Sequence, residues 1–193
     1  MTSTRANLLR STTIVGLRRD GQAALGSDGQ VTLGDTVMKQ NARKVHKIYN
    51  GSILVGFAGS AADALTLFER FEGKLKEARG NLERAVTEMA RDWRSDRILR
   101  RLDALLGVMD RERSYVISGS GDVIEPDDGV IAIGAGGPLA LAVGRALVKH
   151  TRLEPAMIVR EAIGIAAGIN IYTNLNITVE TLEGKLEPPN PKL

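Results

Sequence analysis

The stretch that decides the fold is TTIVGLRRDGQAALGS, residues Thr12–Ser27. Its first half, Thr13–Leu17, is β-branched and apolar, which favours a strand. Asp20-Gly21 is a turn signal, and the segment Ala23–Ser27 can return beside the first strand. The sequence therefore predicts that the fold begins with an antiparallel hairpin.

Further strands follow along the chain, separated by turn residues. Asn50-Gly51, the strongest short hairpin signal in the sequence, joins two of them. The expected strands are Lys44–Tyr49, Ser52–Ala58, Ala104–Met109, Tyr115–Ser118, Val123–Glu125, Val130–Gly134 and one within Asn176–Leu182. The region from Thr12 to about Ala58 is thus expected to hold only strands and turns.

Apolar residues that recur at helical spacing predict two pairs of helices. Ser60 and Asp63 resemble a capping box at the start of the first helix, and Gly80 separates it from the second. The fourth helix has one apolar stripe expected to face the core: Ile158, Ala162, Ile165 and Ile169. The four helices are expected at Ala61–Leu75, from Leu82 towards Arg101, at Pro138–His150 and at Glu154–Ile169.

The order of these elements predicts the fold class. Strict β-α-β alternation, typical of a doubly wound parallel sheet, is absent. Runs of strands with paired helices favour antiparallel sheets covered by helices. We expect an α+β fold, a four-layer α/β/β/α sandwich of two antiparallel sheets between helix pairs. Residues 12–183 would form this single domain, after a leader at 1–11 and before a frayed tail at 184–193.

Composition excludes several kinds of chemistry. The chain has 193 residues, a net charge of +3 and 4% aromatics, and no basic stripe argues for a nucleic-acid partner. It has no cysteine, which excludes disulfides, thiolate catalysis and zinc–thiolate sites. Only His46 and His150 are present, which argues against a histidine metal centre and against a Ser-His-Asp triad. If the protein is a hydrolase, we expect a base other than histidine.

The sequence contains no signal for a membrane or for secretion. No apolar run approaches the roughly 20 residues of a membrane span. The first residues carry Arg5 and Arg10, but the apolar stretch Ala6–Leu9 is too short for a secretory signal. A short organelle-targeting leader stays open as an alternative. A bacterial cytoplasmic protein is the simpler interpretation.

Two glycine-rich segments suggest a nucleotide site. Gly134–Pro138 follows an apolar strand and opens a helix, but Leu139 stands where the third glycine of G-x-G-x-x-G is needed. Gly29–Gly34 has P-loop spacing, but Asp35 replaces the lysine and would repel phosphate. We therefore interpret both segments as tight turns, and we expect no nucleotide or other organic cofactor.

Three residues near the start offer an alternative to histidine chemistry. Thr12 leads into the first strand, Asp28 lies at the far end of its neighbour, and Lys44 lies at the mouth of the next strand. Each alone has an ordinary explanation, because threonine is common in strands, aspartate in turns and lysine at strand ends. Together they can meet at one end of a sheet, where they fit a hydrolase without histidine.

A threonine at a chain terminus carries its own base. Its hydroxyl is a poor nucleophile and needs a proton acceptor beside it. A free α-amino group titrates near pH 8, so it can accept that proton, whereas lysine titrates near 10.4. A nearby Lys44 cation would lower the pKa of the amine, and Asp28 would hold the lysine in place. Removal of Met1–Ser11 would be required, because until then the Thr12 nitrogen is an amide.

These residues resemble the HslV family of proteasome-like peptidases, which are N-terminal-threonine hydrolases. The matching segments keep the family's order and spacing from Thr12 to about Leu182. They are Thr12-Thr13-Ile14-Val15, Asp28-Gly29-Gln30-Val31-Thr32, Arg43-Lys44-Val45, Gly56-Phe57-Ala58-Gly59, Asp92-Trp93-Arg94 and Ile171-Tyr172-Thr173-Asn174. The resemblance implies the N-terminal-nucleophile hydrolase fold and a homo-oligomer of two stacked hexameric rings.

The resemblance also implies an activity and its partners. The family degrades unfolded polypeptides inside a closed chamber fed by the HslU-type AAA+ ATPase, which docks on the ring faces. By position, Thr12 is the nucleophile, Asp28 and Lys44 form the supporting charge pair, and the Gly56 N–H is the oxyanion donor. A sodium site made by backbone carbonyls matches Ala167, Asn170 and Thr173.

The chain departs from the family pattern in two places. Ala135 replaces the usual serine of a Gly-Ser-Gly-Gly segment, and that serine lies near the threonine amine. Alanine cannot hold the amine or pass its proton, so we expect catalysis slower than in other members, or a deliberate exchange at this position. The leader is also longer than the single methionine of many members, so its removal requires either self-cleavage by the protein or another enzyme. A catalytically silent ring subunit is the alternative function.

Overall fold

A computed structural model describes residues 12–59, 61–96, 104–118 and 120–183. Within them the chain alternates between groups of strands and pairs of helices. The strands are β1 (Thr13–Arg19), β2 (Gln22–Ser27), β3 (Val31–Leu33), β4 (Thr36–Lys39), β5 (Val45–Ile48), β6 (Ile53–Ala58), β7 (Leu105–Met109), β8 (Ser114–Ile117), β9 (Val123–Ile124), β10 (Ile131–Gly134) and β11 (Thr178–Leu182). The helices are α1 (Ala61–Glu77), α2 (Leu82–Ser95), α3 (Gly137–His150) and α4 (Pro155–Ala167).

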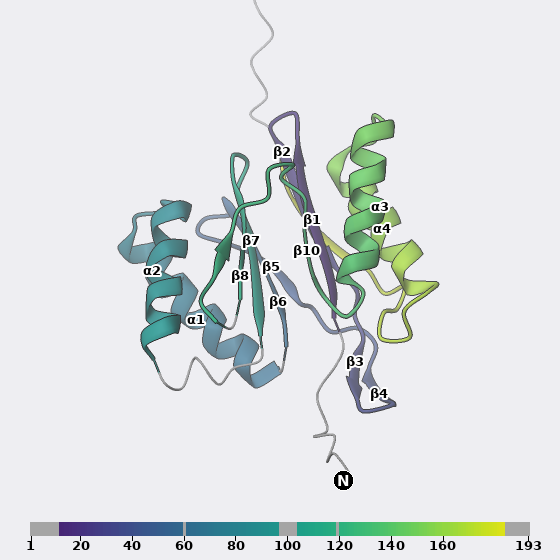
Figure 1. Cartoon of the computed structure of the whole chain (residues 1–193), viewed down its shortest axis with the longest axis horizontal. Helices are drawn as coiled ribbons and strands as arrows, with labels where there is room; N and C mark the ends of the chain where they lie inside the picture. The colour runs from purple at the N-terminus through teal and green to yellow at the C-terminus, as the bar shows by residue number, and fades with distance from the viewer. Residues whose placement is uncertain (1–11, 60, 97–103, 119, 184–193) are drawn as a thin grey trace, which may run out of the picture.

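The strands form two stacked antiparallel sheets and one small hairpin. One sheet has the order β10-β1-β2-β11, the other has the order β5-β6-β7-β8-β9, and β3 pairs with β4. Figure 1 shows α1 and α2 outside the five-stranded sheet and α3 and α4 outside the four-stranded sheet. The expected four-layer α/β/β/α sandwich is therefore confirmed.

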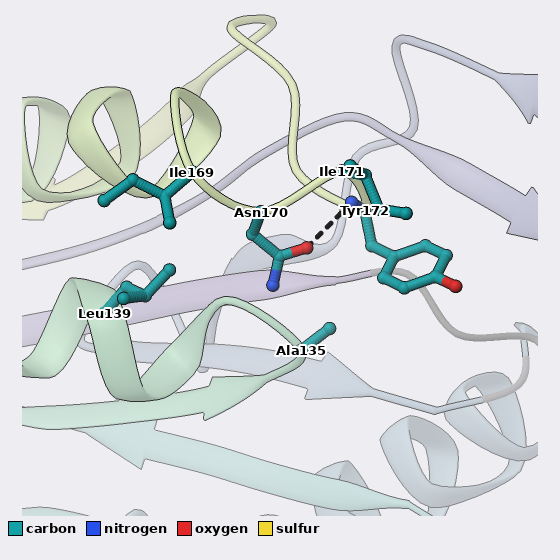
Figure 2. A pocket seen from close by; sticks show the side chains of 6 residues that line it. All are labelled: Ala135, Leu139, Ile169, Asn170, Ile171 and Tyr172. Carbon is teal, nitrogen blue, oxygen red and sulfur yellow. Dashed lines mark hydrogen bonds between the residues drawn. The ribbon is translucent and has the colours of Figure 1, made fainter.

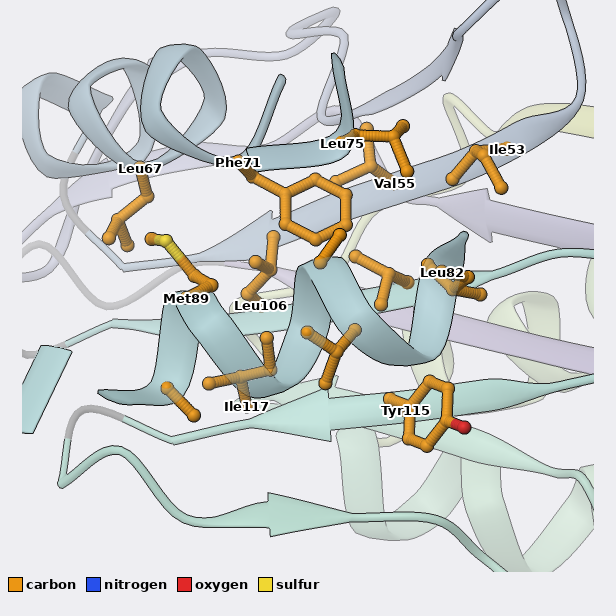
Figure 3. Packing of buried hydrophobic residues seen from close by; sticks show 14 of the residues in the cluster. Ile53, Val55, Leu67, Phe71, Leu75, Leu82, Met89, Leu106, Tyr115 and Ile117 are labelled. Carbon is orange, nitrogen blue, oxygen red and sulfur yellow. The ribbon is translucent and has the colours of Figure 1, made fainter. Parts of the chain in front are cut away.

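Apolar side chains fill the spaces between successive layers. One cluster lies between the five-stranded sheet and α1 and α2, and Figure 3 shows Phe71 and Met89 packing there against strand residues such as Leu106. A second cluster joins the two sheets, with Ile14 and Leu25 among its members. A third lies beneath α3 and α4. Burying one such side chain contributes roughly 1.5–3 kcal/mol, so these three clusters hold the layers together.

The predicted turns are present, with the backbone conformations that their residues favour. Asp20 and Gly21 have φ values of 52° and 74°, and they join β1 to β2. Asn50 and Gly51 also have positive φ values, in a connection that closes on the pair Ile48 and Ile53. Asparagine, aspartate and glycine tolerate this left-handed conformation better than other residues.

The fourth helix differs from the prediction in its inner face and its end. α4 stops at Ala167, and Ile165 and Ile169 are 46% and 64% exposed, so their assignment to the core stripe was wrong. The face that packs on the sheet contains Ile158, Val159, Ala162, Ile163 and Ala166. From Ala162 to Ile169 every residue is apolar or small, so periodicity alone could not select the buried face there.

Other boundaries also changed or fall outside the described residues. The β3–β4 hairpin was not predicted as a separate element, because its strands are only three and four residues long and give a weak local signal. α2 ends at Ser95, and its expected extension towards Arg101 falls in 97–103, outside the described residues, as does Ser60. The leader at 1–11 and the tail at 184–193 also lie outside them. In the part of the chain that the structure describes, no helix has the length and hydropathy needed to cross a membrane.

Candidate active site

Asp28 and Thr13 bind each other at one end of the β1–β2 hairpin. The register pairs Ile14 with Ser27, which places Thr13 and Asp28 one residue further out. The Thr13 N–H donates to Asp28 Oδ1 at 2.8 Å, and the Asp28 N–H donates to the Thr13 carbonyl at 3.1 Å. The residue that follows Thr12 is therefore fixed at its backbone by the Asp28 backbone and carboxylate.

Lys44 shares the same carboxylate oxygen. Its Nζ donates to Asp28 Oδ1 at 2.8 Å, and the two side chains are 9% and 0% exposed. Burial lowers the pKa of Lys44 from the ordinary value of 10.5, while the Asp28 charge and hydrogen bond partly oppose this shift. Lys44 reaches the site from the start of β5, whereas Asp28 follows β2, so this pair joins the two sheets.

The second oxygen of Asp28 is bound by backbone amides. Oδ2 accepts the Gln30 N–H at 2.9 Å and the Asn174 N–H at 3.4 Å. The Asn174 side chain in turn accepts the Gly29 N–H at 3.0 Å and donates to the Gln40 carbonyl at 2.9 Å. A buried carboxylate with amide donors and a cation is satisfied in its charged form. Both oxygens of the Asp28 carboxylate thus have partners that fix it in position next to Thr13.

Thr12 lies in a narrow space against the turn after β10. It is 4% exposed. A Cβ placed on Gly134 would lie 2.0 Å from the Thr12 carbonyl oxygen, and the Gly134 φ of +89° also favours glycine. The sequence interpretation of Gly134–Pro138 as a tight turn is consistent with this contact, because the close approach of the Gly134 backbone to Thr12 requires the glycine.

The Thr13 hydroxyl joins two loops that are distant in sequence. Thr13 Oγ1 lies 2.7 Å from Thr173 Oγ1 and accepts the Gly136 N–H at 3.1 Å. This amide is one that a phosphate cradle would have to offer, so its use by Thr13 is a further argument against nucleotide binding at this turn. Sequence reasoning missed Thr13, Gly136 and Asn174 as site residues. Asn174 was visible only as part of a matching segment, and Thr173 was named for its backbone carbonyl in the sodium site, not for its hydroxyl.

Gly56 occupies the position predicted for the oxyanion donor, in the middle of β6. It pairs with Val45 on one side and with Gly107 on the other. A Cβ at Gly56 would lie 3.1 Å from Ile14 Cδ1 and 3.2 Å from Val45 Cγ1, so a larger residue would have to displace the core below Thr12. Glycine therefore lets the β6 backbone approach β1 closely.

The residues predicted to hold sodium lie where helix α4 ends. Ala167 is its last residue, and the Asn170 carbonyl accepts the Thr173 N–H at 3.1 Å. The C-terminus of a helix is its negative end, and main-chain carbonyls there favour a cation. Carbonyl oxygen is also a suitable ligand for a hard cation, so the chemistry of this loop fits a sodium ion. Among the described residues no cluster of three acidic or histidine side chains offers a different metal site.

Ala135 follows Gly134 at the same turn. It is exposed and lines a pocket together with Leu139 and Tyr172. Its methyl group offers no hydrogen bond, so the hydroxyl expected at this position has no substitute in Ala135 itself.

Comparison with known proteins gives the same assignment for nearly the whole chain. The family model described as Proteasome subunit matches residues 9–182. The HslV subunit of an ATP-dependent protease from Chlorobium luteolum is 57% identical over 173 residues, which are 90% of this chain and 95% of that protein.

Two solved structures share the fold. The crystal structure of eukaryotic HslV from Trypanosoma brucei is 43% identical, with a TM-score of 0.84 over 89% of this chain and 99% of that one. Thiobacillus denitrificans BPH is 18% identical, with a TM-score of 0.69 over 91% of this chain and 100% of that one, and shows a shared fold only.

The two stacked antiparallel sheets between helix pairs, together with the structural match to HslV, define the N-terminal-nucleophile hydrolase fold. The chain belongs to the proteasome family, and within it to the HslV group.

Proposed function

We propose that this chain is a threonine endopeptidase whose nucleophile is the Thr12 hydroxyl, exposed by removal of residues 1–11. The observation that carries the proposal is the Asp28 carboxylate, which binds both the Thr13 N–H and Lys44 Nζ at 2.8 Å. A single buried anion thereby positions the residue next to the nucleophile and the cation required near its amine.

The proposed reaction uses the Thr12 amine as base and acid. The free amine takes the hydroxyl proton, directly or through a water, while Oγ1 attacks the peptide carbonyl. The Lys44 ammonium favours the unprotonated amine by electrostatic repulsion. The backbone N–H of Gly56 would stabilise the negative oxygen of the tetrahedral intermediate. The amine then returns the proton to the leaving nitrogen, and water releases the acyl group from Thr12.

The family supports an assembly and partners for this activity. We propose a double hexameric ring that degrades unfolded polypeptides in its chamber, supplied by an HslU-type AAA+ ATPase in the cytoplasm. The relative from Chlorobium luteolum is named as a subunit of an ATP-dependent protease. The ATPase activity would belong to the partner. The carbonyls of Ala167, Asn170 and Thr173 would hold sodium, which would stabilise the loop that carries Thr173.

A silent ring subunit is the alternative, and Ala135 is the observation that favours it. A subunit without the hydroxyl at this position could keep the assembly surfaces and cleave slowly or not at all. The buried Asp28–Lys44 pair argues for activity, since a buried ion pair is costly to retain and is weak evidence for stability alone.

Hydrolysis of a short fluorogenic peptide by the purified protein tests the proposal. Thr12→Ala should abolish turnover, because no other side chain can replace the hydroxyl. Thr36→Ala is the matched control, since Thr36 lies exposed on β4 and should keep the parent rate. A Thr12→Ala protein that retains the parent rate would refute the proposed nucleophile. A parent that assembles but cleaves no peptide would support the silent subunit.

A further inference from the structure

An unassigned pocket lies beside the proposed nucleophile. It has a volume of about 470 Å³ and is lined by Ala135, Leu139, Ile169, Asn170, Ile171 and Tyr172. Figure 2 shows Ala135, in the turn before α3, and Leu139, in the first turn of α3, on one wall that faces the loop after α4. We propose that this pocket binds an aliphatic side chain of the substrate, on the residue just after the cleaved bond. The inference rests on the proposed threonine mechanism.

Both walls of the pocket continue directly into the residues that hold Thr12 and Thr13. On one wall, Ala135 lies between Gly134, which touches Thr12, and Gly136, which donates to Thr13 Oγ1. On the other wall, Tyr172 precedes Thr173, whose hydroxyl lies 2.7 Å from Thr13 Oγ1. The pocket is therefore fixed to the nucleophile on two sides, as a specificity pocket must be.

The strand register places the pocket on the leaving-group side of the cleaved bond. β1 and β10 are antiparallel and pair Thr13 with Gly134, so Thr12 and Ala135 extend beyond the same end of the ladder. The Thr12 nitrogen therefore lies at the same end of this sheet as the Ala135 turn. The leaving nitrogen must receive its proton from that amine and so lies close to it. Gly56, the proposed oxyanion donor, belongs to the opposite sheet.

The pocket walls favour an aliphatic side chain. Leu139, Ile169 and Ile171 contribute large apolar surfaces, and the two isoleucines are 64% and 76% exposed. The Ala135 methyl group extends this surface without a hydroxyl that would lose its hydrogen bonds to water. A leucine or isoleucine side chain would cover these residues and remove their apolar surface from water.

One polar group in the pocket can orient the peptide backbone. The Asn170 side-chain oxygen accepts the Tyr172 N–H at 2.7 Å, which leaves the amide NH2 as a donor. Within the described part of the chain no protein group accepts from it, and Figure 2 shows it directed across the pocket. It can donate to a carbonyl of the substrate on the leaving side. A mostly apolar pocket that contains an amide donor is typical of a site that selects a side chain and orients its backbone.

Two series of internally quenched peptides test this assignment on the processed, assembled protein. One series varies only the residue after the cleaved bond, among leucine, serine and aspartate, and the other varies only the residue before it. We expect kcat/KM for leucine to exceed that for serine and aspartate by about tenfold or more in the first series. Leu139→Ser should reduce this ratio and leave the preferences of the second series unchanged. Leu175 is exposed in the loop after α4 but does not line the pocket. Leu175→Ser should therefore leave the preferences in both series unchanged.

The outcomes separate the inference from the proposed function. If Thr12→Ala is inactive, equal cleavage of all peptides in the first series would overturn the inference. Such a result is expected if another copy of the chain covers the pocket. If Leu139→Ser changes the preferences of the second series only, the pocket binds the residue before the cleaved bond. This result would also overturn the inference. Thr12→Ala cleaving every peptide at the parent rate would instead remove the mechanism on which the inference rests.

Discussion

The Thr13 N–H donates to the Asp28 carboxylate at 2.8 Å, through the same oxygen that accepts Lys44 Nζ. A carboxylate that positions only the lysine could move with it. Asp28 instead links the Thr13 backbone to the Lys44 ammonium, so a movement of the lysine would also displace the backbone beside the nucleophile. The proposed site is therefore sensitive to this carboxylate in both its stability and its catalysis.

Asp28→Asn should destabilise the fold and abolish peptide hydrolysis. The substitution leaves the buried Lys44 without its counter-charge, and breaking a buried ion pair costs about 3–5 kcal/mol. Chemical denaturation of the unprocessed protein measures the loss. Glu180→Gln is the control, because its pair with Arg43 is partly exposed and should contribute about 0–1 kcal/mol. Equal effects of the two substitutions would contradict the role given to Asp28.

Lys44→Met should move the acid limb of the kcat/KM profile to higher pH. A nearby cation lowers the pKa of the Thr12 amine, so its removal raises that pKa and more base is protonated at neutral pH. Lys47→Met, which removes an exposed cation from the same strand, should leave this limb in place. The prediction fails if both variants keep the parent profile.

The Lys44 charge should also set an alkaline limb. Burial lowers the pKa of Lys44 below its ordinary value of 10.5, so as pH rises the ammonium is lost earlier than that of a free lysine. Loss of the charge would break the pair with Asp28, which fixes the backbone beside the nucleophile, so activity should decline at a lower pH than that at which a free lysine titrates. An alkaline decline that starts only above 10.5 would exclude Lys44 as its source.

Gly136→Ala should destabilise the protein and slow hydrolysis. Gly136 has φ −90°, which any residue can adopt, but a Cβ there would lie 2.2 Å from Thr13 Oγ1 and 2.7 Å from Thr173 Oγ1. Such overpacking costs about 1–3 kcal/mol. Gly164→Ala is the matched control, because nothing lies within 4 Å of its Cβ position, and alanine should stabilise α4 by about 1 kcal/mol. Thermal unfolding that shifts in the same direction for both would contradict the account.

Ala135→Ser should raise kcat for a peptide with a fixed leaving residue. A hydroxyl at this turn could hold the Thr12 amine or pass its proton, which the alanine methyl cannot do. The increase should appear at saturating substrate. An unchanged kcat would indicate that Ala135 does not limit the reaction.

The sequence predicted the layers of this fold and the meeting of Asp28 with Lys44, because hairpin turns and apolar alternation are local signals. The turns at Asp20-Gly21 and Asn50-Gly51 set the strands, and the strand ends then brought the charges together. The contact between Thr13 and Thr173 spans 160 positions and uses two ordinary hydroxyls, so no local pattern indicates it. The wrong inner face of α4 has a similar cause, since only packing on the sheet distinguishes Ile165 from Ile163.

The intact mass of the peptide-cleaving form tests the central claim most directly. The protein is purified as the parent and as Thr12→Ala, and the mass of each assembled fraction is measured beside its rate of peptide hydrolysis. We predict that all activity belongs to chains whose mass shows that they begin at Thr12. The Thr12→Ala variant should be inactive, because its site lacks the threonine hydroxyl. A parent that keeps residues 1–11 and still cleaves peptides at full rate would contradict a mechanism based on a free Thr12 amine.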